Sequence, residues 1–301
     1  MSQVSLNQNV LPNDVGDHRS RLHPLRVGIA GAGAIGGAVA KRLLAEPLPG
    51  LSLTALSAHN PSRAAARVRS MISPDITAQH PLFIAATDLA QHADIVIEAL
   101  PPSLFRSVAE PVLRAGRILI PLSVGALIAE ENDDLVRLAM ENASRIFVPS
   151  GAVGGIDLLR NLQEGGIESV SLITRKPAIS LAGAPWLLDQ GIDISRLSVS
   201  TKVFSGSARQ AVQAFPTNAN VAAAVALAGI GPEQTHVEIW ADPLAESNRH
   251  RIVARGHSAN VSIDIEAKPS VDNPRTSQLA GDSIIALLRR LASDQALLVG
   301  N

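Results

Sequence analysis

Several residue types that support common chemistries are absent or scarce in this sequence. There is no cysteine, which excludes disulfides, thiolate catalysis and thiolate metal ligation. There is no tyrosine, and only five Phe and two Trp are present, so the cores must be aliphatic. Lys plus Arg number 26 against 27 Asp plus Glu, without a basic block, which argues against nucleic acid as a partner.

Two further absences narrow the class of protein. No apolar run reaches the roughly 18 residues that a membrane-spanning helix needs, so we expect no membrane partner. The eight histidines show no ligand spacing and no acid cluster accompanies them, so we predict no metal site. Residues 1–23 are polar and lack the features of a signal peptide, which suggests a disordered leader and a cytoplasmic protein.

The length of 301 residues fits about two domains. In the first half of the chain, predicted strands alternate with predicted helices. Strands are predicted at 26–30, 51–56, 94–100 and 117–121, with helices at 38–44 and 64–71 and from Ser103, as N-cap, to Gly116. Pro111 conflicts with the last helix unless it kinks there. This alternation predicts an α/β domain over 24–147 with a doubly wound parallel sheet.

The second half predicts a different architecture. Strands are expected at 170–174, 197–204, 237–241, 251–255 and 260–266, with helices at 154–163, 207–214, 221–228 and 279–291. In the last strand Val261, Ile263 and Ile265 alternate with polar residues, as in a sheet with one face in water. We therefore predict a second α+β domain over 148–274, for substrate binding and dimerisation, on a mixed, largely antiparallel sheet. Residues 275–301 are expected to pack back on the first domain.

A glycine series follows the first predicted strand and opens a helix. Gly31 suits the tight turn, Gly33 lets backbone approach a pyrophosphate, and Gly36 permits close packing of helix on strand. The helix N-terminus offers free N–H groups to the phosphates. The pattern predicts a Rossmann domain, the alternative being a tight turn in a nucleotide-free domain. The residues assigned to the cofactor here are Gly31, Gly33, Ala34, Ile35 and Gly36.

The segment after the second strand bears on the choice of dinucleotide. It carries no acid between Leu56 and Arg63, whereas an acid there would hold the ribose hydroxyl of NAD. Its hydroxyl, imidazole and guanidinium groups suit a 2′-phosphate better, so the pattern favours NADP or the use of both NAD and NADP. We assign Ser57 and Asn60 to the cofactor. The alternative is that His59 and Arg63 are ordinary solvated side chains.

A hydride transfer also needs a group that exchanges a proton, and histidine serves this near neutral pH. The second half of the chain offers His236, His250 and His257. His250 lies in a polar segment that reads as a loop between strands. Spacing alone would make it a solvated loop residue.

The chain resembles the L-aspartate dehydrogenase family from about Arg26 to Leu291. Nine segments in one order carry the resemblance. They are GIAGAGAIG (28–36), DIVIEA (94–99), SVGAL (123–127), PSGAVGGID (149–157), ITRKP (173–177), FSGSA (204–208), FPTNANVAA (215–223), ADP with NRH (241–243 and 248–250) and NPRTS (273–277).

The resemblance implies an NAD(P)-dependent enzyme that interconverts L-aspartate and iminosuccinate, which exchanges with oxaloacetate and ammonia and can feed synthesis of the nicotinamide ring. It implies His250 as the acid/base residue and Ala152 and Asn220 as cofactor contacts. It also implies a homodimer. The alternatives are a related amino- or hydroxy-acid oxidoreductase, suggested by the unexpected Pro101-Pro102 pair, or a cofactor sensor without catalysis.

A dicarboxylate substrate needs cationic or amide partners. Arg175, Lys176 and Lys202 are the second-domain candidates, each of which could instead be a solvated charge at a strand end. Asn218 is a weaker candidate, since it could instead cap the helix predicted near Val221.

Overall fold

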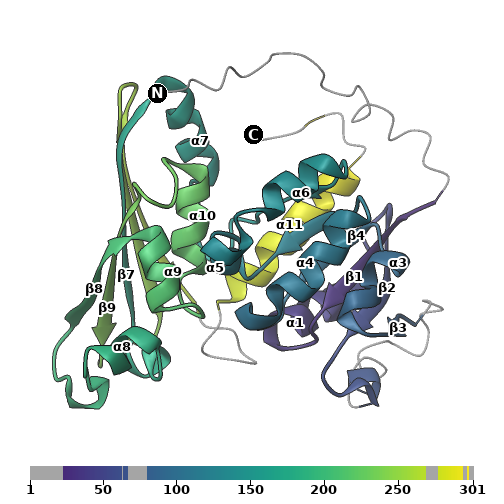
Figure 1. Ribbon diagram of the computed structural model, residues 1–301, viewed down its shortest axis with the longest axis horizontal. Coiled ribbons are helices and arrows are strands. Elements are labelled where there is room, and N and C mark those ends of the chain that lie inside the picture. Colours follow the sequence, from purple (N-terminus) through teal and green to yellow (C-terminus); the bar gives the residue numbers. More distant parts are fainter. Residues whose placement is uncertain (1–22, 63, 67–79, 269–276, 294–296, 298–301) are drawn as a thin grey trace.

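The computed structural model describes residues 23–62, 64–66, 80–268, 277–293 and 297. Two β-sheets stand apart, and helices fill the space between and around them (Figure 1). Residues 1–22 of the leader predicted at 1–23, and residues 67–71 of the helix predicted at 64–71, lie outside the described residues.

The first sheet has six strands in the order β3-β2-β1-β4-β5-β6, and every pairing is parallel. Its strands are β1 (Leu25–Ala30), β2 (Leu51–Ser57), β3 (Leu82–Phe83), β4 (Ile95–Glu98), β5 (Ile118–Pro121) and β6 (Arg145–Ile146). The doubly wound parallel sheet predicted from the sequence is confirmed. The strand order reverses between β1 and β4, which in such sheets marks the crevice where ligands bind.

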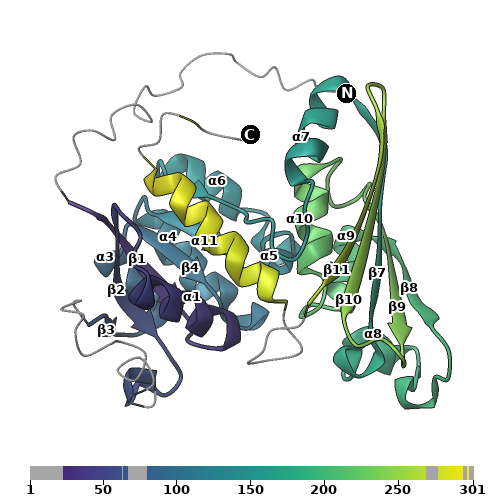
Figure 2. The same cartoon turned by 180° about the vertical axis from the view of Figure 1, so that it is seen from behind.

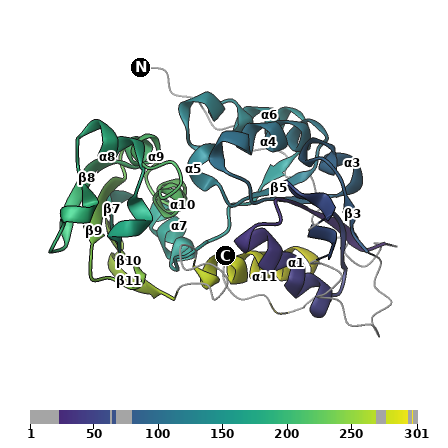
Figure 3. The ribbon, with the colours of Figure 1, turned by 90° about the horizontal axis from the view of Figure 1, so that it is seen from below.

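Helices cover both faces of this sheet (Figure 3). On one face, α1 (Ala34–Ala45) and α11 (Gln278–Ala292) pack together and bury side chains such as Val39 and Ile284 against the strands. On the other, α3 (Leu89–His92), α4 (Phe105–Arg114) and α6 (Leu135–Glu141) bury Leu89, Phe105 and Leu135. The C-terminal helix therefore belongs to the apolar core of the first sheet.

The second sheet has five strands in the order β11-β10-β7-β9-β8. They are β7 (Ile167–Pro177), β8 (Thr201–Ser207), β9 (His236–Asp242), β10 (Asn248–Gly256) and β11 (Asn260–Ala267). Only β7 and β9 pair in parallel, so the sheet is mixed and largely antiparallel, as predicted.

One face of the second sheet packs on helices, and the other carries none among the described residues (Figures 1 and 2). The covering helices are α7 (Ile156–Gly165), α9 (Ala208–Ala214) and α10 (Asn220–Ala228), while α8 (Pro185–Asp189) lies at one end. Because side chains alternate along a strand, Val170, Leu172 and Ile252 are buried beneath the helices. The outer face is polar by the same alternation.

The two sheets are joined by buried contacts. The short helix α5 (Val124–Leu127) follows the first sheet, yet Val124 and Ile128 belong to the core of the second. Arg209 on α9 donates to the carbonyl oxygen of Ile128 at 2.8 Å and forms an ion pair with Asp133. Such contacts hold the carboxyl edge of the first sheet against the inner face of the second.

Three local predictions differ from the structure. The strand predicted at 197–204 begins only at Thr201, because a 3-10 turn occupies Ile194–Arg196. The helix predicted with Ser103 as N-cap begins at Phe105, because the proline pair starts a separate 3-10 turn at Pro102–Leu104. Pro111 is accommodated inside α4, three residues before its end. The first helix begins at Ala34 rather than at residue 38.

No described helix is long and apolar enough to cross a membrane.

Candidate active site

The glycine series forms a tight turn between β1 and α1. Gly31 has φ +100°, and a Cβ there would lie 2.6 Å from the carbonyl oxygen of Ala99. A Cβ on Gly36 would overlap the carbonyl oxygen of Gly31, whereas one on Gly33 would meet open space. The turn therefore needs glycine at 31 and 36 for its own packing, and leaves backbone at Gly33 open to a ligand, as a dinucleotide site requires.

Ser57, at the end of β2, braces this turn. Its hydroxyl is buried and accepts a hydrogen bond from the backbone N–H of Gly31 at 3.2 Å. Beyond it, His59 and Asn60 are exposed, and the carbonyl oxygen of Asn60 accepts the first bond of a helical turn from Ala64. Arg63 lies outside the described residues.

Glu98 ties together the loops that follow β4 and β5, and the sequence analysis did not single it out. Its side chain is fully buried and accepts from the backbone N–H groups of Leu100 at 2.8 Å and Ser123 at 3.1 Å. Burial raises the pKa of this carboxyl, and the N–H donors act in the opposite direction. An acid that ends an otherwise apolar strand was the available signal. Glu98 fixes the shape of the sheet edge that faces the glycine turn.

Asn220 begins α10 and reaches across to the first sheet's side of the molecule. Its Oδ1 accepts a hydrogen bond from the backbone N–H of Gly125 at 3.0 Å. Because that bond requires the oxygen, the Nδ2 donors are left for another partner. Ala152 lies in the linker between the sheets, and the neighbouring Gly151, at φ +64°, donates to Ser283 Oγ on α11.

His250 lies within β10, not in the loop that the sequence suggested. Its side chain is 3% exposed on the inner face, and Nδ1 is 3.1 Å from Thr174 Oγ1 on β7. Burial, together with the positive charge of Lys176, lowers the pKa of His250 to about 3. The imidazole is therefore neutral at pH 7, and Nε2 can accept a proton in the tautomer whose Nδ1–H donates to Thr174 Oγ1.

Lys176 shares the inner face with His250. It lies two residues after Thr174 on β7 and is 8% exposed, with Nζ 3.3 Å from Asn218 Oδ1. Desolvation lowers the pKa of Lys176 to about 8. Asn218 makes this bond rather than capping α10, whose N-cap residue is Ala219.

Arg175 and Lys202 lie on the opposite, outer face of the sheet. Arg175 pairs with Asp242 and Lys202 with Glu238, and both cations lie 5.9 Å from the ring of Trp240. The expectation that they bind substrate beside His250 does not fit this geometry. Adjacent residues of a strand face opposite sides of the sheet, so the sequence already indicated that Arg175 and Lys176 could not both lie beside His250.

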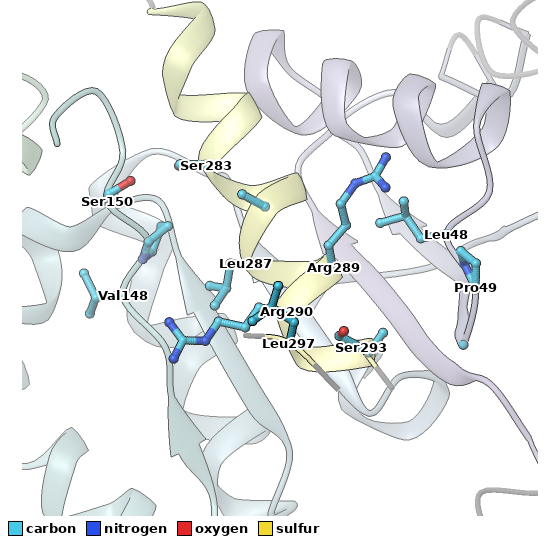
Figure 4. Close-up of a pocket in the computed structure, with 14 residues that line it drawn as sticks. Leu48, Pro49, Val148, Ser150, Ser283, Leu287, Arg289, Arg290, Ser293 and Leu297 are labelled. Atoms are coloured by element: carbon cyan, nitrogen blue, oxygen red, sulfur yellow. The ribbon is translucent and has the colours of Figure 1, made fainter. Parts of the chain in front are cut away.

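A separate pocket of about 890 Å³ lies between α11 and the linker (Figure 4). Leu48, Ser150, Leu287 and Arg289 are among its lining residues. Neither His250 nor Lys176 lines it, so the chemistry described above lies elsewhere.

Comparisons with known proteins bear on this arrangement. Residues 157–291 match the family model "Aspartate dehydrogenase, C-terminal", and 31–149 match "Homoserine dehydrogenase, NAD binding domain". An L-aspartate dehydrogenase of Bradyrhizobium diazoefficiens is 42% identical over 88% of this chain and 91% of its own. The chain belongs to the L-aspartate dehydrogenase family.

Two further comparisons match this chain to the L-aspartate dehydrogenase family. L-aspartate dehydrogenase 3 of Bordetella bronchiseptica is 42% identical over 89% of this chain and 96% of its own. The crystal structure of aspartate dehydrogenase from Thermotoga maritima superposes with a TM-score of 0.64 at 26% identity, over 92% of this chain and all of that one. The family resemblance and the fold read from the sequence are confirmed.

The glycine turn gives a first testable prediction. Gly36→Ala would force the new methyl against the carbonyl oxygen of Gly31 and push α1 away from the turn. We expect the Kd for the reduced dinucleotide to rise at least tenfold, or about 1.4 kcal/mol, measured by fluorescence titration. Gly281→Ala, where α11 leaves open space, is the matched control and should bind normally. Equal affinities in the two variants would remove the turn from the cofactor site.

Proposed function

We propose that this chain catalyses the NAD(P)-dependent interconversion of L-aspartate and iminosuccinate, with His250 as the acid/base residue. Membership of the L-aspartate dehydrogenase family supports the reaction. One observation carries the assignment within this chain. The neutral imidazole of His250 and the ammonium of Lys176 are both buried on the inner face of the second sheet, which faces the predicted dinucleotide-binding domain. A proton acceptor and a cation are what an anionic amino acid needs in order to be oxidised.

The residues fit a dinucleotide at the carboxyl edge of the first sheet. Gly31, Gly33 and Gly36 form the turn, and Ala34 and Ile35 supply the first N–H groups of α1 for its phosphates. Asn220 has free amide hydrogens, and Ala152 belongs to a linker held by Ser283. A nicotinamide dinucleotide held by these residues would supply the acceptor for the hydride from C2 of aspartate.

In this scheme His250 accepts the proton that the substrate nitrogen releases. As the hydride leaves, the amine becomes an imine, and the proton released from nitrogen passes to Nε2 of the neutral imidazole. Thr174 holds Nδ1 and so keeps the ring oriented. In the reverse direction the burial of His250 makes its imidazolium a ready donor to the imine nitrogen, because the charged form is disfavoured.

The reductive direction, from oxaloacetate and ammonia to L-aspartate, tests the proposed reaction. Purified protein with oxaloacetate, ammonia and NADH or NADPH should consume cofactor only when both other components are present. His250→Asn should lower kcat by 100-fold or more, within the range typical of lost general acid–base catalysis, while cofactor binding persists. Consumption with oxaloacetate alone would indicate a hydroxy-acid reductase. Cofactor binding without turnover of any acid would favour a sensor.

We infer that the enzyme accepts NADP at least as well as NAD. No carboxylate follows β2 between Ser57 and Ser62, so nothing there repels a 2′-phosphate. Ser57 itself is committed to Gly31, which leaves the exposed side chains of His59 and Asn60 as neighbours of the ribose.

A single substitution tests this preference. Ala58→Asp places a carboxylate directly after β2, where it would bind the ribose hydroxyls of NAD and repel the phosphate of NADP. We expect the ratio of kcat/KM for NADPH to that for NADH to fall at least tenfold. A ratio that does not change would place the 2′-position elsewhere, and Ser52→Asp, at the other end of β2, is the control.

We also infer a homodimer formed through the outer face of the second sheet. No described helix covers this face (Figure 2). Ile173 lies on it, half-buried, on the central strand β7. The cross-strand neighbours of Ile173 are Arg251 and Glu238, and each is already in an ion pair, with Asp264 and Lys202 respectively, so these charges would enter an interface as neutralised pairs.

Sedimentation equilibrium tests the assembly. The chain of 31.4 kDa should sediment with about twice that mass. Ile173→Asp should shift it to the monomer, because the substitution removes the apolar side chain and adds a carboxylate at the centre of the interface. Val136→Asp, on the exposed side of α6, should not. A wild-type monomer, or a dimer insensitive to Ile173→Asp, would refute this interface.

A further inference from the structure

Lys176 is an unusual cation for a protein interior. Its side chain is 8% exposed, and its one hydrogen bond within the described residues goes to the neutral amide oxygen of Asn218. Within the described parts of the chain, no carboxylate forms an ion pair with Nζ. A buried ammonium without a counter-ion loses hydration and regains little of it from one amide.

Other cations of the same sheet show the contrast. On the outer face each of four strand cations has an acid partner at 3.0 to 3.5 Å. These pairs are Arg175–Asp242, Lys202–Glu238, Arg249–Glu266 and Arg251–Asp264. These four exposed cations thus have acid partners, whereas the buried Lys176 has none among the described residues.

The position of Lys176 relates it to the proposed proton acceptor. Thr174 pairs across β7 and β10 with His250, and Lys176 is the next inward-facing residue along β7. The charge of Lys176 is close enough to His250 to disfavour a second positive charge on the imidazole. An anion that reached Lys176 would therefore lie beside the group that handles the proton.

We propose that Lys176, held by Asn218, binds one carboxylate of the substrate directly and selects for acidic substrates. The inference rests on the proposed function for the identity of the substrate, though not for the existence of a carboxylate site. The bound carboxylate supplies the missing counter-ion, so the cost of burying the ammonium in the free protein is offset on binding. It also screens Lys176 from His250, which lets the imidazole take up the proton released by the amine.

Asn218 has a defined part in this site. Its Oδ1 accepts from Lys176 and its Nδ2 donates to Thr217 Oγ1 at 3.1 Å, so the amide has one orientation. Lys176 has three hydrogens, and the bond to Asn218 uses one of them. The remaining hydrogens are available to a carboxylate.

Succinate is a suitable probe because it has two carboxylates and no reacting group. We expect Lys176→Met to weaken succinate binding to the NADH-saturated protein at least tenfold, measured by titration calorimetry, and to raise the KM for L-aspartate by a similar factor. The affinity for NADH should not change. Lys202→Met, which removes a lysine from the opposite face of the same sheet, is the matched control and should bind succinate normally.

Two further readouts separate binding from a structural role. Methionine fills the space of the lysine stem without a charge, so Lys176→Met should raise the midpoint of thermal unfolding. A lysine that stabilised the fold would give a lower midpoint. In the wild type, succinate affinity should fall above a pH of about 8, where the ammonium loses its proton, while Lys176→Arg should keep its affinity there. His250 is the other titratable group that acts on this site among the described residues, and it is neutral throughout that range.

The outcomes distinguish the two proposals. Wild-type protein that turns over aspartate, with succinate affinity unchanged in Lys176→Met, would refute the role of Lys176 and leave the reaction standing. Succinate binding that depends on Lys176, in a protein without aspartate turnover, would support the carboxylate site and refute the reaction. A lowered unfolding midpoint with unchanged succinate affinity would make Lys176 a structural residue.

Discussion

The pairing of β7 with β10 is the constraint on which the site depends. It sets His250 opposite Thr174 and turns both toward the helices, and the two-residue repeat of a strand then brings Lys176 to the same face. A shift of β7 by one residue would turn Arg175 inward in place of Thr174 and Lys176, and a shift of β10 would turn Arg249 and Arg251 inward in place of His250. Leu172 on β7 and Ile252 on β10 form the next inward-facing pair, two residues along from Thr174 and His250. Both are buried, and a shift of either strand is opposed because it would expose the one on that strand. The packing of the inner face therefore fixes the chemistry.

Burial links the properties of the two site residues. The helices that cover the inner face remove water from His250 and Lys176 alike, and the pKa of each falls for that reason first. An imidazole with a pKa near the usual 6.5 accepts a proton readily at neutral pH, whereas His250, with its pKa lowered to about 3, is neutral but a weak base. A buried neutral imidazole accepts one only when its surroundings become more favourable to charge. An anionic substrate beside Lys176 provides that change, so binding and proton transfer depend on one electrostatic arrangement.

The sequence predicted the architecture because its signals are local. The alternation of strands and helices, the glycine series after β1, and the alternating Val261, Ile263 and Ile265 each report the geometry of one element. The site was harder, because it depends on which strands are neighbours. No spacing along the chain shows that residue 174 meets 250, and a polar NRH segment reads as a loop until its partner strands are known. The choice between Arg175 and Lys176 was available from alternation alone, since Leu172 and Lys176 share a face and Arg175 does not.

The site also needs the two sheets to keep one relative position, because a hydride moves only between closely placed atoms. Three contacts of different kinds hold that position. Asn220 Oδ1 receives the N–H of Gly125, Ser283 receives the N–H of Gly151, and α5 buries Val124 in the core of the second sheet. The first two use backbone N–H groups of α5 and of the linker, both of which follow strands of the first sheet at its carboxyl edge, where the dinucleotide is expected. Asn220, which we propose as a cofactor contact, thus also holds the two sheets together, so its substitution is expected to affect both cofactor binding and the placement of His250.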